Sequence, residues 1–264
     1  MIGTCKLCLT ANVDLQNSHL IPAGAYKLIH SSDGSSPIVM KSAVTIKKDE
    51  QITDYVLCGE CEQRFNDNGE RWVLGYCNQF GAGFRLNDLL DQAQPLEVVG
   101  DAAIYAGSAI PEIDMEKLAY FAASVLWRGS AHDWRSGKDA VRSPKLGPYE
   151  EDFRKYLMGH GPFPPNVFFG VDIVGDKNLW PSVFVPYGGR REDLMRQYVF
   201  PFLGIVFLFL LGKSVDPARF RYCTYRSPER LITRGSMKNA TFINDVGKLM
   251  IKSRVVGPLK KVGK

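Results

Sequence analysis

The chain has 264 residues and a formal net charge of +5, and 45% of its residues are hydrophobic and 23% charged. This composition excludes wholesale disorder and is typical of a globular protein with enough apolar material for a core. The length allows one large domain or a small module joined to a larger one, and we expect two units.

The charge is unevenly distributed along the chain. Residues 213–264 hold thirteen Lys or Arg against three acidic residues, a net charge of +10, which leaves −5 for residues 1–212. A basic C-terminal region is typical of a phosphate-binding surface, because electrostatics supplies most of the non-specific affinity for nucleic acid. A solvated basic tail would give the same pattern.

The N-terminal stretch "MIGTCKLC" has no apolar segment behind a basic start, so we expect no secretory signal and a cytoplasmic protein. In that setting a Cys-x-x-Cys pair indicates a metal site rather than a disulfide. The most apolar run, residues 199–211, is too short to span a membrane and is interrupted by Pro201 and Gly204. We expect a buried strand or two strands bent at Gly204, and no membrane partner.

Residues 1–75 are expected to form the first unit, with the order strand, loop, strand, helix. The Ser- and Gly-rich stretch 30–37 predicts a turn, and the alternating stretch "AVTIKK" that follows predicts a half-exposed strand. Apolar spacing after Cys61 predicts a helix that begins at the second cysteine pair, which Asn68-Gly69 would weaken at its third turn.

Two Cys-x-x-Cys pairs frame this unit. Four thiolates are the preferred tetrahedral ligand set of a structural zinc ion. The predicted zinc ligands are Cys5, Cys8, Cys58 and Cys61. The long separation between the pairs leaves a chance pairing of unrelated cysteines as the alternative. The remaining Cys77 and Cys223 are expected to be small buried side chains.

Residues 76–112 are predicted to be a connector with one short helix around residues 86–90, and residues 113–264 a second, α+β domain. Asp114 is a candidate N-cap for a helix over residues 114–134. A second helix is expected over residues 147–159, with Pro148 in its first turn and Gly159 after its end.

The rest of the second domain reads as short strands of a mainly antiparallel sheet, so the predicted fold class of the whole chain is α+β. The runs are "NVFFGVDIV", "SVFVPYG", "FLGIVFLFLL", "RFRYCTYRS" and "ATFINDV".

The order Cys-x-x-Cys, then "SHLIP", then Cys-x-x-Cys running into a helix resembles the zinc-clipped branch of the HNH, or His-Me finger, endonucleases. The resemblance covers about the first 75 residues. It implies a ββα unit that holds one catalytic divalent cation beside a separate structural zinc. It also implies that His19 is the general base, which suits an imidazole that titrates near neutrality.

The sequence departs from this family at two metal-ligand positions. Ser18, a poor ligand, stands where the family commonly has an aspartate, and Glu62 stands where it commonly has His or Asn. Glu62 is a competent oxygen ligand for Mg²⁺ or Mn²⁺. On a regular helix Glu62, Asn66 and Glu70 would share one face, so that Glu62 and Asn66 could rebuild a one-metal site near His19.

Each of these candidates has an ordinary structural alternative. The helix face could be merely solvated, with Glu62 placed favourably at the positive end of the helix dipole. His19 could be a buried histidine bonded to backbone beside the zinc.

Two further stretches have phosphate-binding composition. Residues 127–135 combine two Trp, two Arg and a His, which suits stacking on bases or, alternatively, a helix end packed on a second domain. Arg226, Arg230, Arg234 and Lys238 would form a basic stripe if their segment were helical, although its Thr, Ile and Gly argue against a stable helix. No Ser-His-Asp triad, flavin site or nicotinamide site is visible.

The leading hypothesis is a metal-dependent HNH-like nuclease, which the resemblance places in host defence or a mobile element. It would act on DNA or another nucleic acid, while the C-terminal domain binds nucleic acid or a protein partner. The first rival is a zinc module that has lost catalysis and serves as a nucleic-acid-binding or scaffolding subunit, and Ser18 favours it. The second rival is an interaction protein that does not contact nucleic acid, which would show no salt-dependent DNA binding.

Overall fold

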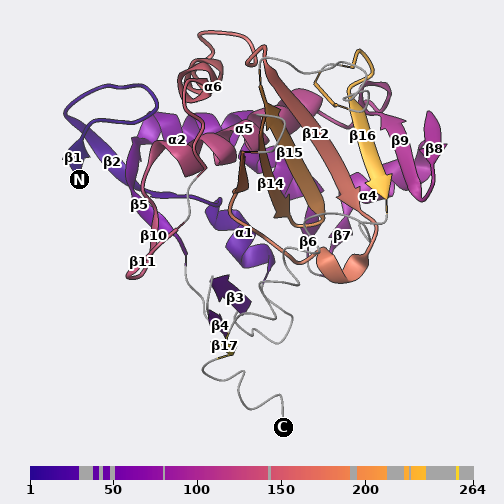
Figure 1. Cartoon of the computed structure of the whole chain (residues 1–264), viewed down its shortest axis with the longest axis horizontal. Coiled ribbons are helices and arrows are strands. Elements are labelled where there is room, and N and C mark those ends of the chain that lie inside the picture. Colours follow the sequence, from indigo (N-terminus) through magenta and orange to yellow (C-terminus); the bar gives the residue numbers. More distant parts are fainter. Residues whose placement is uncertain are drawn as a thin grey trace.

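The computed structural model shows an N-terminal strand and helix unit beside a larger sheet that is backed by helices (Figure 1). The residues it describes are 1–29, 38–41, 44–47, 51–79, 81–141, 144–190, 195–212, 223–225, 227–235 and 254–255.

The N-terminal unit is built on a three-stranded antiparallel sheet. Its order is β1 (Ile2–Gly3), β2 (Val13–His19), β5 (Thr53–Cys58). The helical segments are α1 (Ala23–Leu28), α2 (Gly59–Phe65), the π-helical turn η1 (Asn66–Glu70) and α3 (Arg71–Tyr76). A separate small sheet holds β17 (Arg254–Val255), β4 (Val44–Lys47) and β3 (Ile38–Lys41). The helix that begins at the second cysteine pair is therefore confirmed, and so is the strand in "AVTIKK".

A seven-stranded sheet forms the larger part of the molecule. Its order is β13 (Tyr187–Arg190), β14 (Arg196–Phe202), β15 (Ile205–Leu211), β12 (Val167–Val174), β16 (Leu231–Gly235), β9 (Ala102–Ala106), β8 (Glu97–Val99). Neighbouring strands are antiparallel except β12 and β16, which are parallel. The predicted α+β class with a mainly antiparallel sheet is confirmed.

The remaining elements are helices and short hairpins. The helices are α4 (Arg85–Gln92), α5 (Met115–Ala131) and α6 (Tyr149–Met158), with 3-10 turns η2 (Gly107–Ala109) and η3 (Lys177–Leu179). The hairpins are β6 (Asn78–Gln79) with β7 (Gly83–Phe84), and β10 (Arg135–Ser136) with β11 (Asp139–Ala140).

The helix boundaries follow the predicted capping signals. The Asp114 side chain accepts a hydrogen bond of 2.9 Å from the Lys117 backbone N–H and so caps α5. Helix α6 begins directly after Pro148 and ends at Met158, with Gly159 as the C-cap after its end, as expected.

The apolar run 199–211 forms a hairpin of two buried strands, β14 and β15. The turn lies at Leu203-Gly204, where Gly204 has φ +90°, a conformation that favours glycine. In the described part of the chain no helix has both the length and the apolar character that crossing a membrane requires.

One apolar core joins the large sheet to the helices. Every second side chain of β14 and β15 points to the helical face of the sheet. Phe121 of α5 lies with its ring centroid 4.8 Å from Phe202 and 5.6 Å from Phe207, and Phe153 of α6 lies 5.8 Å from Phe209. The same cluster of buried residues extends into the N-terminal unit. The boundaries at residues 75 and 112 remain predictions.

The predicted connector contains two strands in addition to the expected helix. Helix α4 lies where a short helix was expected, and strands β8 and β9 add to the large sheet through pairing of β9 with β16. These strands are only three and five residues long, and the turn-rich sequence around them conceals their alternation.

One prediction of secondary structure in the second domain is wrong. "SVFVPYG" makes only one isolated bridge, at Val183, before β13 begins at Tyr187, since Pro186 has no N–H to donate. Arg234 lies in strand β16, which agrees with the sequence argument that its segment does not favour a stable helix. "ATFINDV", Arg226, Lys238, the loop 30–37 and most of "RFRYCTYRS" lie outside the described residues.

The π-helical turn η1 lets the helix continue through Asn68-Gly69, where the sequence predicted a weak point. Gly69 is buried against α5, and a Cβ at this position would lie 2.9 Å from the Phe121 backbone nitrogen and Cα. Here glycine permits a close approach of two helical backbones.

We predict that Gly69→Ala destabilises the protein by about 1–3 kcal/mol, because the added methyl group forces the two backbones apart. Urea unfolding measures this change in the free energy of unfolding. The matched control is Gly75→Ala on helix α3, where a Cβ would meet nothing within 4 Å. That control should be neutral or slightly stabilising, and equal losses in both variants would contradict the proposed contact.

Strand β12 carries an acidic residue, Asp172, within the sheet. Its carboxylate accepts a hydrogen bond of 2.8 Å from the Thr233 hydroxyl on the parallel neighbour β16. Burial raises the pKa of Asp172 from 3.8 to about 6, although the Thr233 bond opposes this shift. Between these two pH values the folded protein keeps a proton that the unfolded chain has released, so stability from this group is lost as the pH rises.

We predict that Asp172→Asn raises the free energy of unfolding at pH 7.5 by about 1–2 kcal/mol, because the amide still accepts from Thr233 and carries no buried charge. At pH 4, where Asp172 is mostly protonated in the folded state, the gain should nearly disappear. Urea titrations at both pH values test this, with the exposed Asp101→Asn as control. A gain of equal size at both pH values would exclude ionisation as its cause.

Candidate functional site

The first cysteine pair lies in a tight turn between β1 and β2. The Leu9 N–H donates to the Cys5 carbonyl at 3.0 Å, and Leu9 has φ +63°, which reverses the chain directly after Cys8. Cys5 is fully buried and Cys8 is half-buried, so the turn presents two thiols to the protein interior.

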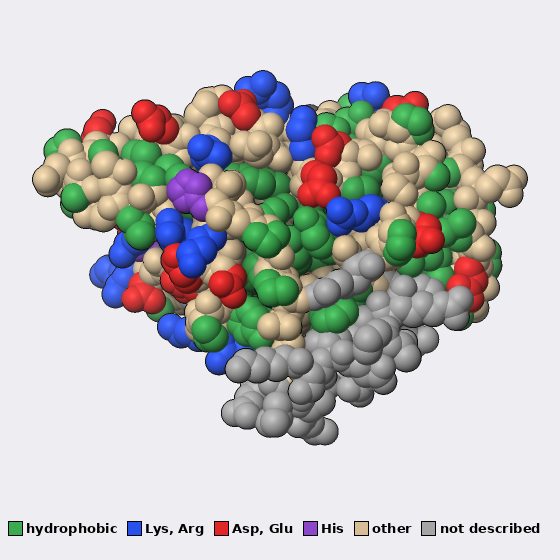
Figure 2. Space-filling model, turned by 90° about the horizontal axis from the view of Figure 1, so that it is seen from above, with side chains coloured by type: hydrophobic (Ala, Val, Ile, Leu, Met, Phe, Trp, Pro, Cys, Tyr) green, Lys and Arg blue, Asp and Glu red, His purple; other side chains and the backbone are tan. Residues whose placement is uncertain are grey.

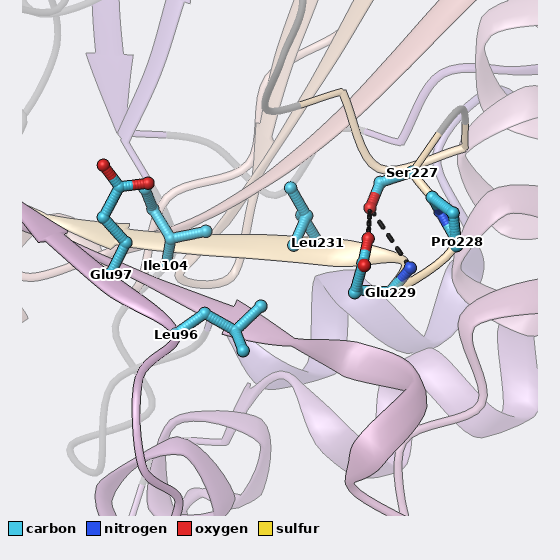
Figure 3. Close-up of a pocket in the computed structure, with 7 residues that line it drawn as sticks. All are labelled: Leu96, Glu97, Ile104, Ser227, Pro228, Glu229 and Leu231. Carbon is cyan, nitrogen blue, oxygen red and sulfur yellow. Dashed lines mark hydrogen bonds between the residues drawn. The ribbon is translucent and has the colours of Figure 1, made fainter.

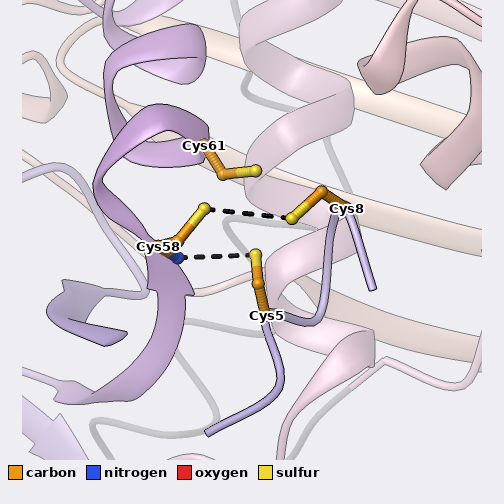
Figure 4. A group of neighbouring side chains, drawn as sticks. All are labelled: Cys5, Cys8, Cys58 and Cys61. Atoms are coloured by element: carbon orange, nitrogen blue, oxygen red, sulfur yellow. Dashed lines mark hydrogen bonds between the residues drawn. The ribbon is translucent and has the colours of Figure 1, made fainter. Parts of the chain in front are cut away.

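The second cysteine pair lies at the junction of a strand and a helix. Cys58 ends β5 and is the N-cap residue of α2, and Cys61 lies in the first turn of that helix. Figure 4 shows the four side chains pointing toward one centre. The Cys8 and Cys58 sulfurs are 3.9 Å apart, and all four sulfurs lie within 4.8 Å of one another.

These distances fit a tetrahedral metal site. Zn–S bonds of about 2.3 Å place the sulfurs of a tetrahedral site about 3.8 Å apart. A hydrogen bond from Cys61 lowers the pKa of Cys5 to about 4, and the same bond, with burial, raises the pKa of Cys61, because a second thiolate beside the first would be repelled. A dication would remove this repulsion, so the cluster could hold a structural metal such as zinc.

His19 is the last residue of β2, opposite Thr53 of β5. Its ring is half-buried, and Nε2 lies 2.7 Å from the Gln51 Oε1 atom. With an amide oxygen facing it, Nε2 is the donor of this hydrogen bond, and in the neutral ring Nδ1 is then the acceptor. His19 is therefore not the fully buried, backbone-bonded histidine of the structural alternative, and its role as a base remains a prediction.

Ser18 has a structural role. It is 1% exposed, and its hydroxyl accepts a hydrogen bond of 3.1 Å from the Leu57 N–H. The pairing register of β2 shifts between Leu15 and Asn17, so both Leu15 and Ser18 point inward although they are three residues apart. This explains why a small hydroxyl residue precedes His19, and it removes Ser18 from the candidate metal ligands.

Glu62 and Asn66 lie one helical turn apart on the segment that follows Cys61. Glu62 belongs to α2, and its Oε1 atom is buried with no hydrogen-bond partner among the described residues. Asn66 is half-buried and begins η1, where the Arg71 N–H bonds to the Asn66 carbonyl, five residues back.

The third member of the predicted stripe, Glu70, ends the π-helical turn η1 and pairs with Arg128. That Glu62, Asn66 and Glu70 share one face stays a prediction. Within the described residues, only the four cysteines form a group of three or more His, Cys, Asp or Glu with metal-binding spacing.

Arg128 of α5 is a site residue that the sequence placed only within the aromatic and basic cluster 127–135. It is 1% exposed, its Nη1 donates to the His19 carbonyl at 2.9 Å, and its Nη2 is bonded to the Glu70 carboxylate. Its guanidinium carbon lies 5.1 Å from the centre of the Phe65 ring. The sequence held one signal of its burial. Arg128 falls three residues after Val125, on the apolar stripe of α5, and a charged residue on such a stripe indicates a buried side chain with a partner.

The aromatic and basic cluster at residues 127–135 is a packed helix end. Trp127 and Trp134 are each 1% exposed, and the Trp134 indole N–H donates to the Arg128 carbonyl at 2.7 Å. His132 Nε2 lies 2.8 Å from an Asp54 carboxylate oxygen, a bond that lowers the pKa of Asp54. These tryptophans are buried and not available to stack on bases, so the coarser part of the alternative, a packed helix end, is confirmed.

The face of the molecule shown in Figure 2 has no strong separation of charge. On this face, basic and acidic side chains intermingle. Arg230 pairs with Glu116 at 2.7 Å and Arg234 with Asp91 at 2.5 Å, so neither guanidinium adds to a basic surface. Most of the basic region after residue 212 lies outside the described residues, and its role as a phosphate-binding surface stays a prediction.

A cavity of about 410 Å³ lies at the β8 edge of the large sheet (Figure 3). Leu96, Ile104 and Leu231 line it with apolar surface. The Glu229 carboxylate on its rim accepts a 2.5 Å hydrogen bond from the Ser227 hydroxyl. The cavity lies far from the cysteine cluster, since β8 and β1 are at opposite ends of the molecule (Figure 1).

No protein-family model and no curated protein matches the sequence, and no solved structure matches the fold. The class of protein is therefore defined by the fold and the site alone. It is an α+β protein whose N-terminal strand and helix unit carries a four-cysteine site suited to a structural metal such as zinc.

We predict that the purified protein holds about one zinc ion per chain and that Cys58→Ser abolishes this binding, because three thiolates and a hydroxyl form a much weaker ligand set. Elemental analysis measures the zinc content. Loss of the metal should also lower the thermal stability of the N-terminal unit, since metal binding and folding are coupled. The control is Cys77→Ala, a buried cysteine on the same helical segment, which should retain zinc. Equal zinc contents in both variants would contradict the site.

Proposed function

We propose that this protein is a metal-dependent nucleic-acid phosphodiesterase of HNH-like type, with DNA as the preferred substrate. The observation that carries the proposal is the placement of His19 at the end of β2, in a unit where β2 and β5 are antiparallel and α2 follows β5 directly. This is the ββα order that the resemblance implies, beside a four-cysteine cluster that suits the separate structural zinc.

In the proposed reaction His19 takes a proton from the water that attacks the phosphodiester. The Gln51 oxygen at Nε2 fixes the tautomer and the ring orientation, and it leaves the Nδ1 lone pair for that proton. An imidazole titrates near neutrality and can pass the proton on, which makes His19 suitable as a base.

Glu62 and Asn66 are the proposed ligands of a catalytic Mg²⁺ or Mn²⁺ ion. The buried Glu62 Oε1 atom, which has no hydrogen-bond partner among the described residues, supports this assignment, because a buried carboxylate oxygen requires a hydrogen-bond donor or a cation. When bound, such an ion would supply positive charge to the scissile phosphate.

We predict that His19→Ala lowers the rate of Mg²⁺- or Mn²⁺-dependent cleavage by at least about 100-fold, which is the usual contribution of a general base. Nicking of supercoiled plasmid and cleavage of single-stranded DNA measure the rate, with zinc content checked for each protein. The control is His160→Ala, an exposed histidine after α6, which should cleave as the wild type does. Full activity in His19→Ala would exclude this residue as the base.

The competing function is a non-catalytic zinc module that binds nucleic acid or serves as a scaffolding subunit. The buried, backbone-bonded hydroxyl of Ser18 favours it, because one metal ligand of the family is then missing. In that case zinc-loaded wild type would cleave neither substrate. DNA affinity that falls with salt would then indicate a binding subunit, whereas no DNA binding would indicate a protein scaffold.

A further inference from the structure

Arg128 links three segments that the proposed reaction requires. It lies near the end of α5, more than 100 residues from the end of β2 along the chain, yet it binds the His19 carbonyl and the Glu70 carboxylate at the same time. Glu70 ends the π-helical turn that follows Glu62 and Asn66. The strand end that carries the base and the helix that carries the proposed metal ligands are thus fastened to one guanidinium.

The contacts leave this guanidinium little freedom. Its side chain is 1% exposed, and the Glu70 side chain is 13% exposed. The Phe65 ring packs against it, and the Trp134 indole binds the Arg128 backbone carbonyl and fixes the helix end. A planar guanidinium with two bonded groups sets their separation and relative direction, which the single point charge of a lysine cannot do.

We propose that Arg128 is a positioning residue of the His19 site. This inference rests on the proposed function, but the geometry it predicts can be tested without catalysis. Arg128 does not contact substrate. It acts through the backbone of His19 and through Glu70, and it holds the imidazole at a fixed distance from Glu62 and Asn66. A displacement of about 1 Å in such a site costs about 100-fold in rate.

The molecule contains a matched control, Arg154 of α6. Its Nη1 donates to the Leu7 carbonyl at 2.8 Å, and its guanidinium pairs with the Glu151 carboxylate, so it too joins one backbone carbonyl to one carboxylate. Its two partners, Leu7 and Glu151, do not belong to the His19 site, and Arg154 is not a metal ligand.

The experiment compares Arg128→Lys with Arg154→Lys in the full-length, zinc-loaded protein. Arg128→Lys should lower kcat by about 10- to 100-fold with KM nearly unchanged, because substrate contacts are intact and only the base is misplaced. Arg154→Lys should keep kcat within about twofold, since the bonds of the Arg154 guanidinium do not involve the His19 site. Equal kcat values for Arg128→Lys and the wild type, or equal losses in the two variants, would overturn the proposal.

A second readout does not depend on activity. Diethyl pyrocarbonate modifies imidazoles, and mass spectrometry reports the rate at His19 itself. Release of the His19 backbone should speed this modification at least about threefold in Arg128→Lys and leave it unchanged in Arg154→Lys. Unchanged rates in both variants would overturn the positioning role. If the wild type does not cleave DNA, the nuclease proposal fails, and this rate still decides the role of Arg128.

Arg128→Lys could fail to fold, since it disturbs a buried ion pair. The double variant Arg128→Met with Glu70→Met removes both charges and keeps the volume, a replacement that is often tolerated. It should fold and retain zinc, yet show the same loss of kcat and the same faster modification of His19. A folded double variant with wild-type values of both would contradict the proposal.

Discussion

The arrangement of the N-terminal unit on the rest of the molecule depends on one buried charge, the guanidinium of Arg128. A charged group that is 1% exposed has lost nearly all its water, and it is stable only if protein groups replace that water. The Glu70 carboxylate and the His19 carbonyl do so for the two terminal nitrogens, while Nε is buried with no hydrogen-bond partner among the described residues. Both groups must therefore approach α5 closely. The glycine at position 69 and the π-helical turn that ends at Glu70 are the local features that permit this approach.

The cysteine cluster imposes a second constraint, at the other end of the same unit. It brings the turn that follows β1 against the junction of β5 and α2, across about 50 residues of chain. A metal that closes so long a loop restricts the unfolded chain strongly. Arg154 adds a bond from α6 to the Leu7 carbonyl between the first two cysteines. The unit is thus held by its own thiols at one end and by arginines from α5 and α6 on two sides.

Local signals in the sequence were enough to predict the elements whose causes are local. The Cys-x-x-Cys spacing predicted the metal cluster, Asp114 predicted the start of α5, and Pro201 with Gly204 predicted a strand pair rather than a membrane segment. Features that depend on a distant partner were missed. One such feature is the pair of Glu70 with Arg128, 58 residues away in the chain. Strand β8 pairs with β9, which in turn pairs with β16. A strand of three residues has too little alternation of polar and apolar side chains to be predicted from the sequence.

The same distinction applies to the candidate catalytic residues. Side chains on a strand alternate between its two faces, and the register shift in β2 sends Ser18 into the interior and His19 to the other face. Ser18, which is buried with its hydroxyl bonded to the Leu57 N–H, is therefore not placed to bind a metal beside His19. In the proposed site the cation near His19 would take its protein ligands from the helix. Glu62, with a buried oxygen that has no hydrogen-bond partner among the described residues, is the side chain best suited to that role. If this oxygen binds a cation, the one-ligand loss at position 18 is compatible with catalysis, and the small hydroxyl of Ser18 serves to bind the Leu57 N–H and keep β2 and β5 in register.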